Sequence, residues 1–321
     1  MSGRSVGVDV GGTKIEAVLV EHDGAVVATA RRATPRAADA PGVVVADTIA
    51  AAIGDLAAAA GGADLAAGPV GVGVPGMLSL EGTIVFSPNL PSTSGVDLRA
   101  VLSVRNGLHH VTLVNDADAA AVAEHRLGAA RGVDDFVLVT LGTGIGGGLV
   151  VGGRLVRGSN GFAGEIGHVV VDPSGPRCPC GKRGCWERYA SGAGVARLSR
   201  EAAVGGRLGS VVSLVGDAEA VRGEDVTHAA AAGDREALAV LDEVGWWLAL
   251  GIANLAAVLD PSCVVLGGGL VEASSLLLPP TRRHLVGLLE AGEVRPALDV
   301  RAAALGPRAG AIGAALLARD G

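Results

Sequence analysis

Three cysteines lie close together in the middle of the chain, and a histidine precedes them. Cys178, Cys180 and Cys185 fall within eight residues, and His168 stands ten positions before the first of them. Three thiolates and one imidazole form the closed tetrahedral ligand set of structural Zn²⁺, and a small loop of this kind gains folding energy from the metal. The spacing favours structural zinc over a disulfide framework or buried free thiols, and it leaves no open position for catalysis by the metal.

Two glutamates flank this cysteine loop. Glu165 lies in the run Gly164–His168, and Glu187 follows the last cysteine by two positions. Either glutamate alone could be a charged surface residue. A metal loop would instead hold both carboxylates in fixed positions, where they could accept hydrogen bonds from vicinal hydroxyl groups.

Asn115 and Asp116 stand where an expected strand ends and an expected helix begins. Residues of these types often cap helices, and capping would be enough to explain the presence of either residue at this place. A carboxylate at this place could also accept the proton of a substrate hydroxyl during phosphoryl transfer. Both roles remain open for Asp116, whereas Asp118 is expected to be solvated or to cap the helix.

Glycine-rich turns are the remaining candidate sites: Asp9–Lys14, Leu141–Gly148 and Gly267–Gly269. In the first two, backbone N–H groups could approach phosphate oxygens, and Asp9 could hold hydrated Mg²⁺. The third follows an expected strand, where small residues would let a nucleotide base lie against the backbone. Ordinary hairpin turns are the alternative for the first two, and the first does not match a P-loop.

The hydrophobic pattern predicts the elements that position these residues. We expect a hairpin with strands at 6–9 and 15–20 and a third strand from 25, a helix over 43–60, strands at 70–74 and 111–114, a helix over 117–127, strands at 136–141 and 146–151, a helix over 234–258, a strand at 263–266 and a helix over 309–318. The order of the first elements predicts a mixed sheet. Because the pattern restarts at residue 136, it also predicts a duplicated unit with a cleft between the copies.

Composition restricts the class of protein. The 321 residues suffice for two domains, and 49% hydrophobic with only 2% aromatic residues is typical of an α/β core built from Ala, Val and Leu. A net charge of −7 with scattered basic residues argues against nucleic acid as a partner. Neither a leader at the N-terminus nor a later membrane-spanning stretch is recognised, so we expect a cytoplasmic protein.

These motifs, in their order along the chain, resemble those of the ROK group of sugar kinases and sugar-responsive repressors. The resemblance covers nearly the whole chain and includes a closing segment at Leu305–Ala315. It implies an α/β actin-like ATPase (ribonuclease H-like) fold of two duplicated domains with an interdomain cleft. The domains would be 1–116, with the C-terminal helix 309–318 packing back on it, and 117–308, with the zinc knuckle 168–185. A homodimer is also implied.

The resemblance assigns roles to residues of this chain. Asp116 would be the catalytic base, and ATP with Mg²⁺ would be bound by Asp9, Gly11, Gly12, Thr13, Lys14, Thr143, Gly144, Gly268 and Gly269. Contacts to the sugar would come from Gly76, Asn89, Asn115, Asp116, Glu165, His168 and Glu187. His168 would serve twice, with one ring nitrogen on zinc and the other toward the sugar.

Glucose, phosphorylated to glucose 6-phosphate, is the expected substrate. Ser92 and Thr93 follow Asn89 where bacterial glucokinases of this group often have an aromatic residue, so N-acetylmannosamine, fructose, an amino sugar and a cyclitol remain alternatives. A sugar-binding regulator without catalysis is an alternative of another class, and a zinc redox protein is a third. A repressor is disfavoured because only five residues precede the first expected strand, too few for a helix-turn-helix.

Overall fold

The structure is a computed structural model that describes residues 3–35, 42–62, 64–65, 67–87, 90–270, 274–291 and 294–320. Asn89, expected to contact the sugar, lies outside the described residues. The chain divides into two compact units, each of which draws on separate stretches of sequence. Unit 1 comprises Met1–Asp134, Gly148–Gly164 and Ala304–Gly321, and unit 2 comprises Asp135–Gly147 and Glu165–Ala303.

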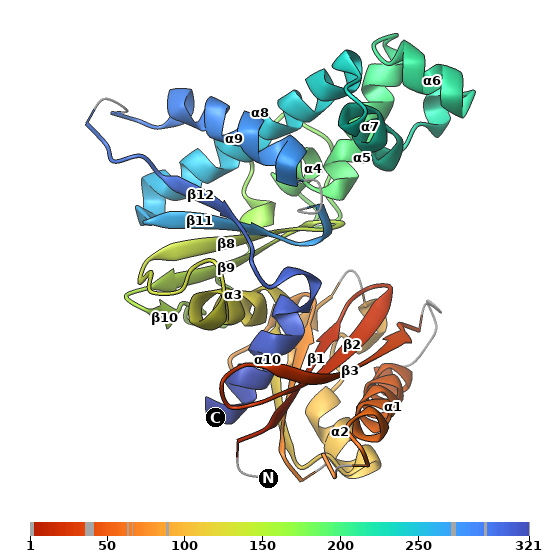
Figure 1. Ribbon diagram of the computed structural model, residues 1–321, viewed down its shortest axis with the longest axis vertical. Coiled ribbons are helices and arrows are strands. Elements are labelled where there is room, and N and C mark those ends of the chain that lie inside the picture. The colour runs from red at the N-terminus through yellow and green to blue at the C-terminus, as the bar shows by residue number, and fades with distance from the viewer. Residues whose placement is uncertain are drawn as a thin grey trace. The chain divides into compact units, whose positions relative to one another are not determined.

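A five-stranded sheet in the order β3-β2-β1-β4-β7 is the centre of unit 1 (Figure 1). Its strands are β1 (Ser5–Val10), β2 (Lys14–Val20), β3 (Val26–Ala33), β4 (Pro69–Val74) and β7 (His110–Asn115). The first three strands are antiparallel neighbours, whereas β4 runs parallel to both β1 and β7. The predicted mixed sheet is therefore confirmed.

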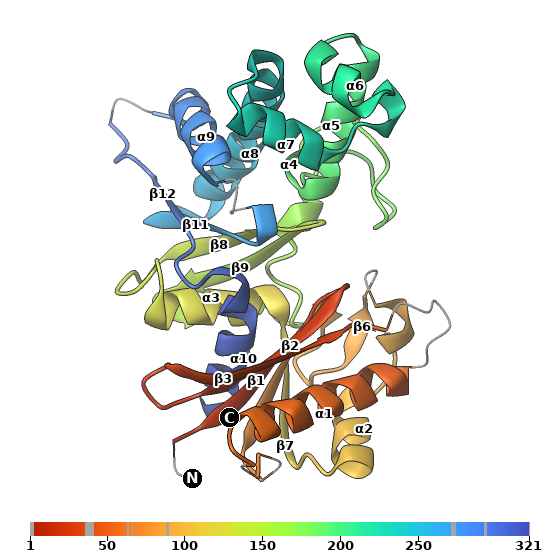
Figure 2. The same ribbon diagram turned by 45° about the vertical axis from the view of Figure 1, so that its right-hand side comes forward.

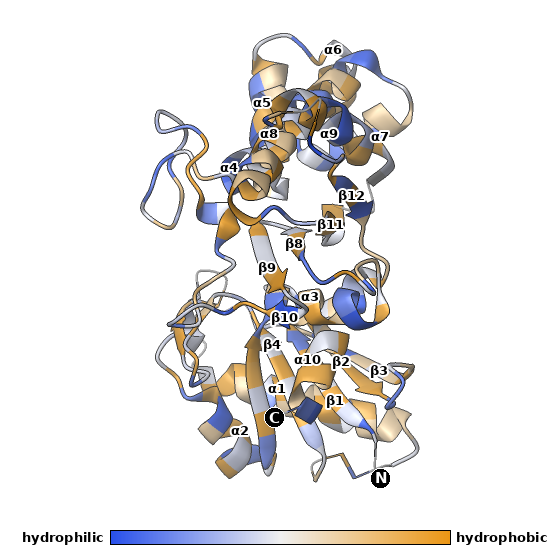
Figure 3. Ribbon diagram, turned by 90° about the vertical axis from the view of Figure 1, so that its left-hand side faces the viewer, coloured by the Kyte–Doolittle hydropathy of each residue, from blue (hydrophilic) through white to orange (hydrophobic). Residues whose placement is uncertain are grey.

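Side-chain alternation gives the two faces of this sheet different partners. The valines of β1 and β4 pack with Ile49 and Leu56 of α1 (Gly42–Ala59), and in Figure 3 hydrophobic residues alternate with paler ones along these strands. The glycines on the other face lie under α10 (Ala309–Asp320). A methyl group built on Gly71 would lie 1.9 Å from the Ala314 carbonyl oxygen, so only glycine allows this approach. Figure 2 shows α1 and α10 on opposite faces of the sheet.

Other short elements complete unit 1. They are β5 (Met77–Leu78), β6 (Ile84–Phe86), a 3₁₀ turn (Pro91–Thr93), α2 (Leu98–Asn106), α3 (Asp116–Leu127), β10 (Arg154–Leu155) and a 3₁₀ turn (Gly306–Arg308). The segment that leads into α10 is fixed by Glu124 of α3, whose side chain is fully buried. Its carboxylate accepts the N–H groups of Ala304 (3.1 Å) and Leu305 (2.8 Å), and also that of Ala129 (2.7 Å).

The second five-stranded sheet has the order β10-β9-β8-β11-β12, the same pattern as the first: an N-terminal hairpin beside two later strands. Its other strands are β8 (Phe136–Leu141), β9 (Ile145–Val151), β11 (Cys263–Gly267) and β12 (Asp299–Ala302). β11 runs parallel to both β8 and β12, as β4 does to β1 and β7. This correspondence is the structural form of the predicted duplication.

Helices make up most of the remainder of unit 2. They are a 3₁₀ turn (Ile166–His168), α4 (Glu187–Ala190), α5 (Gly192–Val204), α6 (Gly209–Val215), a 3₁₀ turn (Ala218–Ala220), α7 (Gly223–Ala231), α8 (Arg235–Leu259) and α9 (Ser274–Leu288). α5, α6, α7 and α8 share an apolar core that includes Val195, Val226 and Val244. Asp234 caps α8 by accepting the Ala237 N–H at 2.9 Å.

By length and composition alone, α1 and α8 are apolar enough to cross a membrane, which is weak evidence for a membrane span. Core helices of globular proteins pass the same test, and 56% of the most apolar stretch of α8 is buried within the structure. The division into units differs from the expected boundary at residue 116. It places α3 with unit 1, where this helix packs against α10.

Candidate active site

The turn between β1 and β2 is closed by hydrogen bonds to its backbone. The Gly11 N–H donates to the Lys14 carbonyl at 2.9 Å, and the Thr34 hydroxyl donates to the Gly11 carbonyl at 2.6 Å. The Thr34 N–H donates to the Thr13 carbonyl at 3.1 Å. Gly12 and Thr13 are exposed at the tip, so the turn presents its backbone to solvent while Thr34 holds its base.

Lys14 is held by a carboxylate that no local sequence motif identifies, that of Glu16. Its Nζ donates to Oε2 of Glu16 at 2.9 Å, and Nη2 of Arg31 donates to Oε1 of the same residue at 3.0 Å. The Glu16 side chain is only 6% exposed, so two cations neutralise a nearly buried charge. Arg31 faces Glu16 through the register of β2 and β3, which the sequence alone does not reveal.

Asp9 lies in β1, with its carboxylate against the first turn of α10. A methyl group built on Gly310 would lie 3.1 Å from the Asp9 Cγ. Burial, and then the charge of Asp116, raise the pKa of Asp9 to about 7, although Lys14 acts in the opposite direction. Near neutral pH this carboxyl can therefore exchange a proton or accept a cation with little cost.

Asn115 and Asp116 form the start of α3. Oδ1 of Asn115 caps the helix by accepting the N–H groups of Ala117 (2.9 Å) and Asp118 (3.0 Å). Its Nδ2 donates to the Gly76 carbonyl at 3.0 Å. Asp116 is the first residue of the helix, and its Oδ1 also lies 2.9 Å from the Ala117 nitrogen. The capping role left open for this pair thus falls mainly to the asparagine.

Gly73 of β4 and Gly76, which follows that strand, lie close to this pair. Gly76 has a φ of +112°, and a methyl group on it would lie 2.3 Å from the Phe86 carbonyl oxygen. A methyl group on Gly73 would lie 3.7 Å from the Asp116 Cα and 3.8 Å from Oδ1 of Asp9. Asp9 and Asp116 therefore lie on neighbouring parts of unit 1, on either side of a residue without a side chain.

Asp118 differs from its expected solvated or capping position. It is 3% exposed, and its Oδ2 lies 3.9 Å from Nε of Arg157. The reason is helical geometry, because two positions along a helix turn the side chain to the opposite face. Asp118 is therefore directed into the interior of unit 1.

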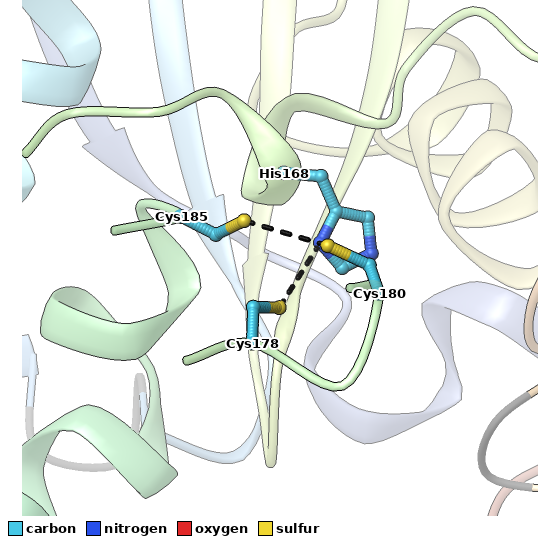
Figure 4. A group of neighbouring side chains, drawn as sticks. All are labelled: His168, Cys178, Cys180 and Cys185. Atoms are coloured by element: carbon cyan, nitrogen blue, oxygen red, sulfur yellow. Dashed lines mark hydrogen bonds between the residues drawn. The ribbon is translucent and has the colours of Figure 1, made fainter. Parts of the chain in front are cut away.

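The four predicted metal ligands converge in unit 2 (Figure 4). The ligand atoms of His168, Cys178, Cys180 and Cys185 all lie within 4.8 Å of one another. Sγ of Cys178 is 3.7 Å from Nδ1 of His168, and Sγ of Cys180 is 3.5 Å from Sγ of Cys185. A tetrahedron with Zn–S and Zn–N bonds of about 2.3 and 2.1 Å has edges of about 3.6–3.8 Å. The donor set and the spacing both fit this ion.

Both flanking glutamates lie beside the histidine. Oε2 of Glu165 is 3.9 Å from Nε2 of His168, and Oε1 of Glu187 is 3.7 Å from Nδ1. Burial raises the pKa of Glu165, and Glu187 raises it further, whereas His168 lowers it. The structure thus gathers two carboxylates and an imidazole at one edge of the cysteine loop.

The cysteine loop is fixed to α8 through Trp186. This side chain is 1% exposed, and its Nε1 donates to the Trp247 carbonyl at 2.8 Å. Gly251 makes room for it, since a methyl group there would lie 1.9 Å from the indole ring. Tyr189 stacks on Trp247 with a centroid distance of 3.9 Å. The sequence alone does not reveal these contacts, because they depend on which face of α8 meets the loop.

The two remaining glycine segments also lie in unit 2. Thr143 and Gly144 form the turn between β8 and β9, and Thr143 is exposed. Gly268 has a φ of +88°, and a methyl group on it would lie 2.5 Å from the Leu141 carbonyl oxygen. Gly269 is exposed, with open space where a side chain would project. The structure therefore places the end of β11 beside the end of β8.

Known proteins resemble this chain over its full length. The ROK family model matches residues 5–321. A glucokinase of Streptomyces coelicolor is 37% identical, covering 99% of this chain and 98% of the relative. An N-acetylmannosamine kinase of Shigella boydii is 33% identical, covering 98% of both chains. A crystal structure of a ROK family glucokinase from Streptomyces griseus, in complex with glucose and AMPPNP, matches with a TM-score of 0.88 and 39% identity over 99% of this chain and all of that one.

The family match and the structural match span the same residues as the motifs described above. The similar order of strands in the two sheets and the α/β architecture agree with the expected actin-like ATPase fold. The chain belongs to the ROK family.

Proposed function

We propose that this chain is an ATP-dependent sugar kinase that converts glucose to glucose 6-phosphate. The observation that carries the proposal is the placement of Asp116 at the start of α3, beside Asp9, in a chain that is similar over its full length to glucokinases. A hydroxyl proton must leave as the phosphoryl group arrives, and a carboxylate is well suited to accept it.

The groups in unit 1 would act on the reacting atoms. Asp116 accepts the proton of the primary hydroxyl, and the second amide proton of Asn115 is available to a sugar oxygen. Backbone N–H groups of Gly12 and Thr13 donate to phosphate oxygens, Gly11 closes the turn that presents them, and Lys14 adds positive charge nearby. Asp9 holds hydrated Mg²⁺, which supplies charge neutralisation on the phosphates when it is bound.

The groups in unit 2 would orient the sugar and the nucleotide. Glu165, Glu187 and His168 bind vicinal hydroxyls, because carboxylates and an imidazole at one edge of a rigid loop make directed hydrogen bonds. Thr143 and Gly144 bind phosphate, and Gly268 and Gly269 leave space for the base. Gly76 and Asn89 belong to the proposed sugar site as well.

Zn²⁺ in the cysteine cluster is part of the proposal. Cys178, Cys180, Cys185 and Nδ1 of His168 would hold it, which leaves Nε2 of the histidine for Glu165 or the sugar. The ion would be structural, since the four donors close the coordination shell. Metal analysis of the purified protein tests this: one tightly held Zn²⁺ per chain is expected, and a metal-free active protein would contradict it.

Two further properties complete the proposal. Cytoplasmic location is supported by the use of the cysteines, three in the proposed zinc site and Cys263 buried in the core, because thiols outside disulfides are typical of a reducing compartment. A homodimer is expected by family resemblance, and light scattering of the purified protein would detect it.

A panel of acceptors with ATP tests the proposed reaction. ADP release is expected to be fastest with glucose, and NMR of the product should place the phosphate on the 6-hydroxyl. The similarity to an N-acetylmannosamine kinase makes that sugar the first competitor, followed by fructose, an amino sugar and a cyclitol. Sugar binding without ADP release from any acceptor would instead support a non-catalytic regulator.

A further inference from the structure

A short segment of unit 2 contacts both the cysteine cluster and the turn between β8 and β9. The segment runs from Glu187 to Ala193 and contains the junction of α4 and α5. The glycine turn comprises residues 142–144. These two pieces are far apart in sequence, and nothing in their composition indicates that they meet.

Glu187 makes the side-chain connection. Its Oε1 lies 3.0 Å from Sγ of Cys178, and its Oε2 faces the turn. A methyl group built on Gly144 would lie 2.6 Å from that Oε2. The carboxylate is 16% exposed, so it fills the space between the cluster and the turn with little freedom to move. A side chain at position 144 would therefore have to displace this carboxylate.

Backbone hydrogen bonds make the second connection. The Gly192 N–H donates to the Gly142 carbonyl at 2.8 Å, and the Ala193 N–H approaches the Thr143 carbonyl at 3.4 Å. Ser191 joins this contact to the glutamate, because its hydroxyl donates to the Glu187 carbonyl at 2.6 Å. The same Ser191 oxygen caps α5 by accepting the Gly194 N–H at 3.3 Å. The turn is thus attached to the first residues of α5.

We propose that Glu187 and Ser191 make the position of the 142–144 turn depend on the cysteine cluster, so that the metal sets nucleotide affinity as well as sugar affinity. The inference rests on the proposed function, which assigns this turn to the nucleotide phosphates. A metal that fixes Cys178 and Cys185 also fixes the start of α4. The turn is hydrogen-bonded to Gly192 and Ala193, which follow the other end of that helix, so its position depends on where α4 lies. Glu187 and Ser191 act here as positioning residues for the turn.

Binding without sugar tests the coupling. The affinity of a non-hydrolysable ATP analogue is measured by calorimetry on zinc-loaded protein and on protein stripped with a chelator, with circular dichroism to verify that the fold remains. Stripping is expected to weaken analogue binding about 10-fold, the lower end of the range for outer contacts of a metal site. Equal affinity for the two forms would overturn the inference. A loaded protein that binds no analogue would instead contradict the proposed function.

A glycine substitution tests the same link while the metal stays in place. In Gly144→Ala the added methyl group must displace the Glu187 carboxylate, so glucose binding measured without nucleotide should weaken while zinc content stays at the wild-type value. Gly142→Ala is the matched variant, since a methyl group there meets nothing within 4 Å, and it should weaken glucose binding much less. Equal glucose affinities for the two variants would show that the turn does not act on Glu187.

Discussion

Asp116 has two roles in the proposed reaction: it begins α3, and it accepts the proton of the substrate hydroxyl. Oδ1 lies near the Ala117 nitrogen, at 2.9 Å. In the proposed reaction the carboxylate accepts the substrate proton while the helix holds the side chain in one orientation.

Asp116→Asn should separate these roles. The amide keeps the size of the side chain and its contact with the backbone, but it cannot accept a proton. We expect kcat to fall by a factor of about 10²–10⁴, with glucose affinity nearly unchanged. Asp97→Asn is the control, because Asp97 caps α2 through the Ala100 N–H and asparagine caps equally well. Turnover by Asp116→Asn near the control rate would remove Asp116 from the role of base.

The raised pKa of Asp9 predicts a pH-dependent stability. The carboxyl ionises near pH 3.8 when unfolded and near about 7 when folded, so the unfolded chain becomes charged first. The stability that neutral Asp9 contributes is present below pH 3.8 and is lost as pH rises through about 7. In magnesium-free urea titrations, wild-type protein should lose free energy of unfolding relative to Asp9→Asn over this range.

Asp55→Asn provides a comparison, because the pH dependence of the stability contributed by Asp55 is expected to have the opposite sign. Arg32 lowers the pKa of Asp55 through a hydrogen bond, so the contribution of this carboxylate is present at neutral pH and lost as pH falls. If the free energies of unfolding of wild type and Asp9→Asn keep a constant difference from acid to neutral pH, that result would contradict the assigned pKa of Asp9.

At the level of elements, the contact of α10 with the first sheet depends on glycines. Gly71→Ala would place a methyl group 1.9 Å from the Ala314 carbonyl, so the helix must move away from β4. We expect a loss of about 2 kcal/mol or more in the free energy of unfolding. Gly54→Ala, in α1 with nothing within 4 Å, should instead add about 0.5–1 kcal/mol by helix propensity. Thermal unfolding of both variants tests this expectation. If both substitutions change the stability in the same direction, the described packing of α10 on β4 is contradicted.

The elements that could be predicted from the sequence have a strong hydrophobic periodicity or clear turn residues at their ends. β1, β4, β8 and β11 are runs of valine and leucine that end at glycines or polar residues, and α8 is long enough to be recognised by its apolar spacing. α5, α6, α7 and α9 were not anticipated: α6 and α7 are short, α5 begins with small residues, and α9 contains Pro279 and Pro280, which usually interrupt helices. α2 was also missed, although Asp97 and Gly107 mark its ends.

Local motifs identified the candidate site, whereas its supporting contacts depend on register and packing. The cysteine cluster could be read from spacing, and its ligand atoms do converge. The pairing of Glu16 with Arg31 requires the β2–β3 register, and the burial of Asp118 requires a partner for that face of α3. Neither the pairing of Glu16 nor the burial of Asp118 can be inferred from the few residues that neighbour it in the sequence.

At the scale of the whole molecule, removal of the metal should affect the two units differently. The cluster is joined to α8 through Trp186, and these residues all lie in unit 2. Hydrogen exchange read by mass spectrometry after chelation should therefore rise in residues 165–190 and along α8, because loss of a structural metal removes folding free energy locally. Peptides from β1, β4 and α10 should exchange at the untreated rate. Uniform acceleration throughout the chain would show that the metal stabilises both units.

The place of α10 in the chain has a consequence for biosynthesis. This helix covers the glycine-lined face of the first sheet, yet the ribosome makes it only after every strand and helix of unit 2. A nascent chain that ends before Ala304 must carry β1 and β4 with one face uncovered, and incompletely packed domains of this kind are prone to aggregate until they are finished. Unit 1, most of which is translated first, can therefore complete its packing only after the whole of unit 2 has been made.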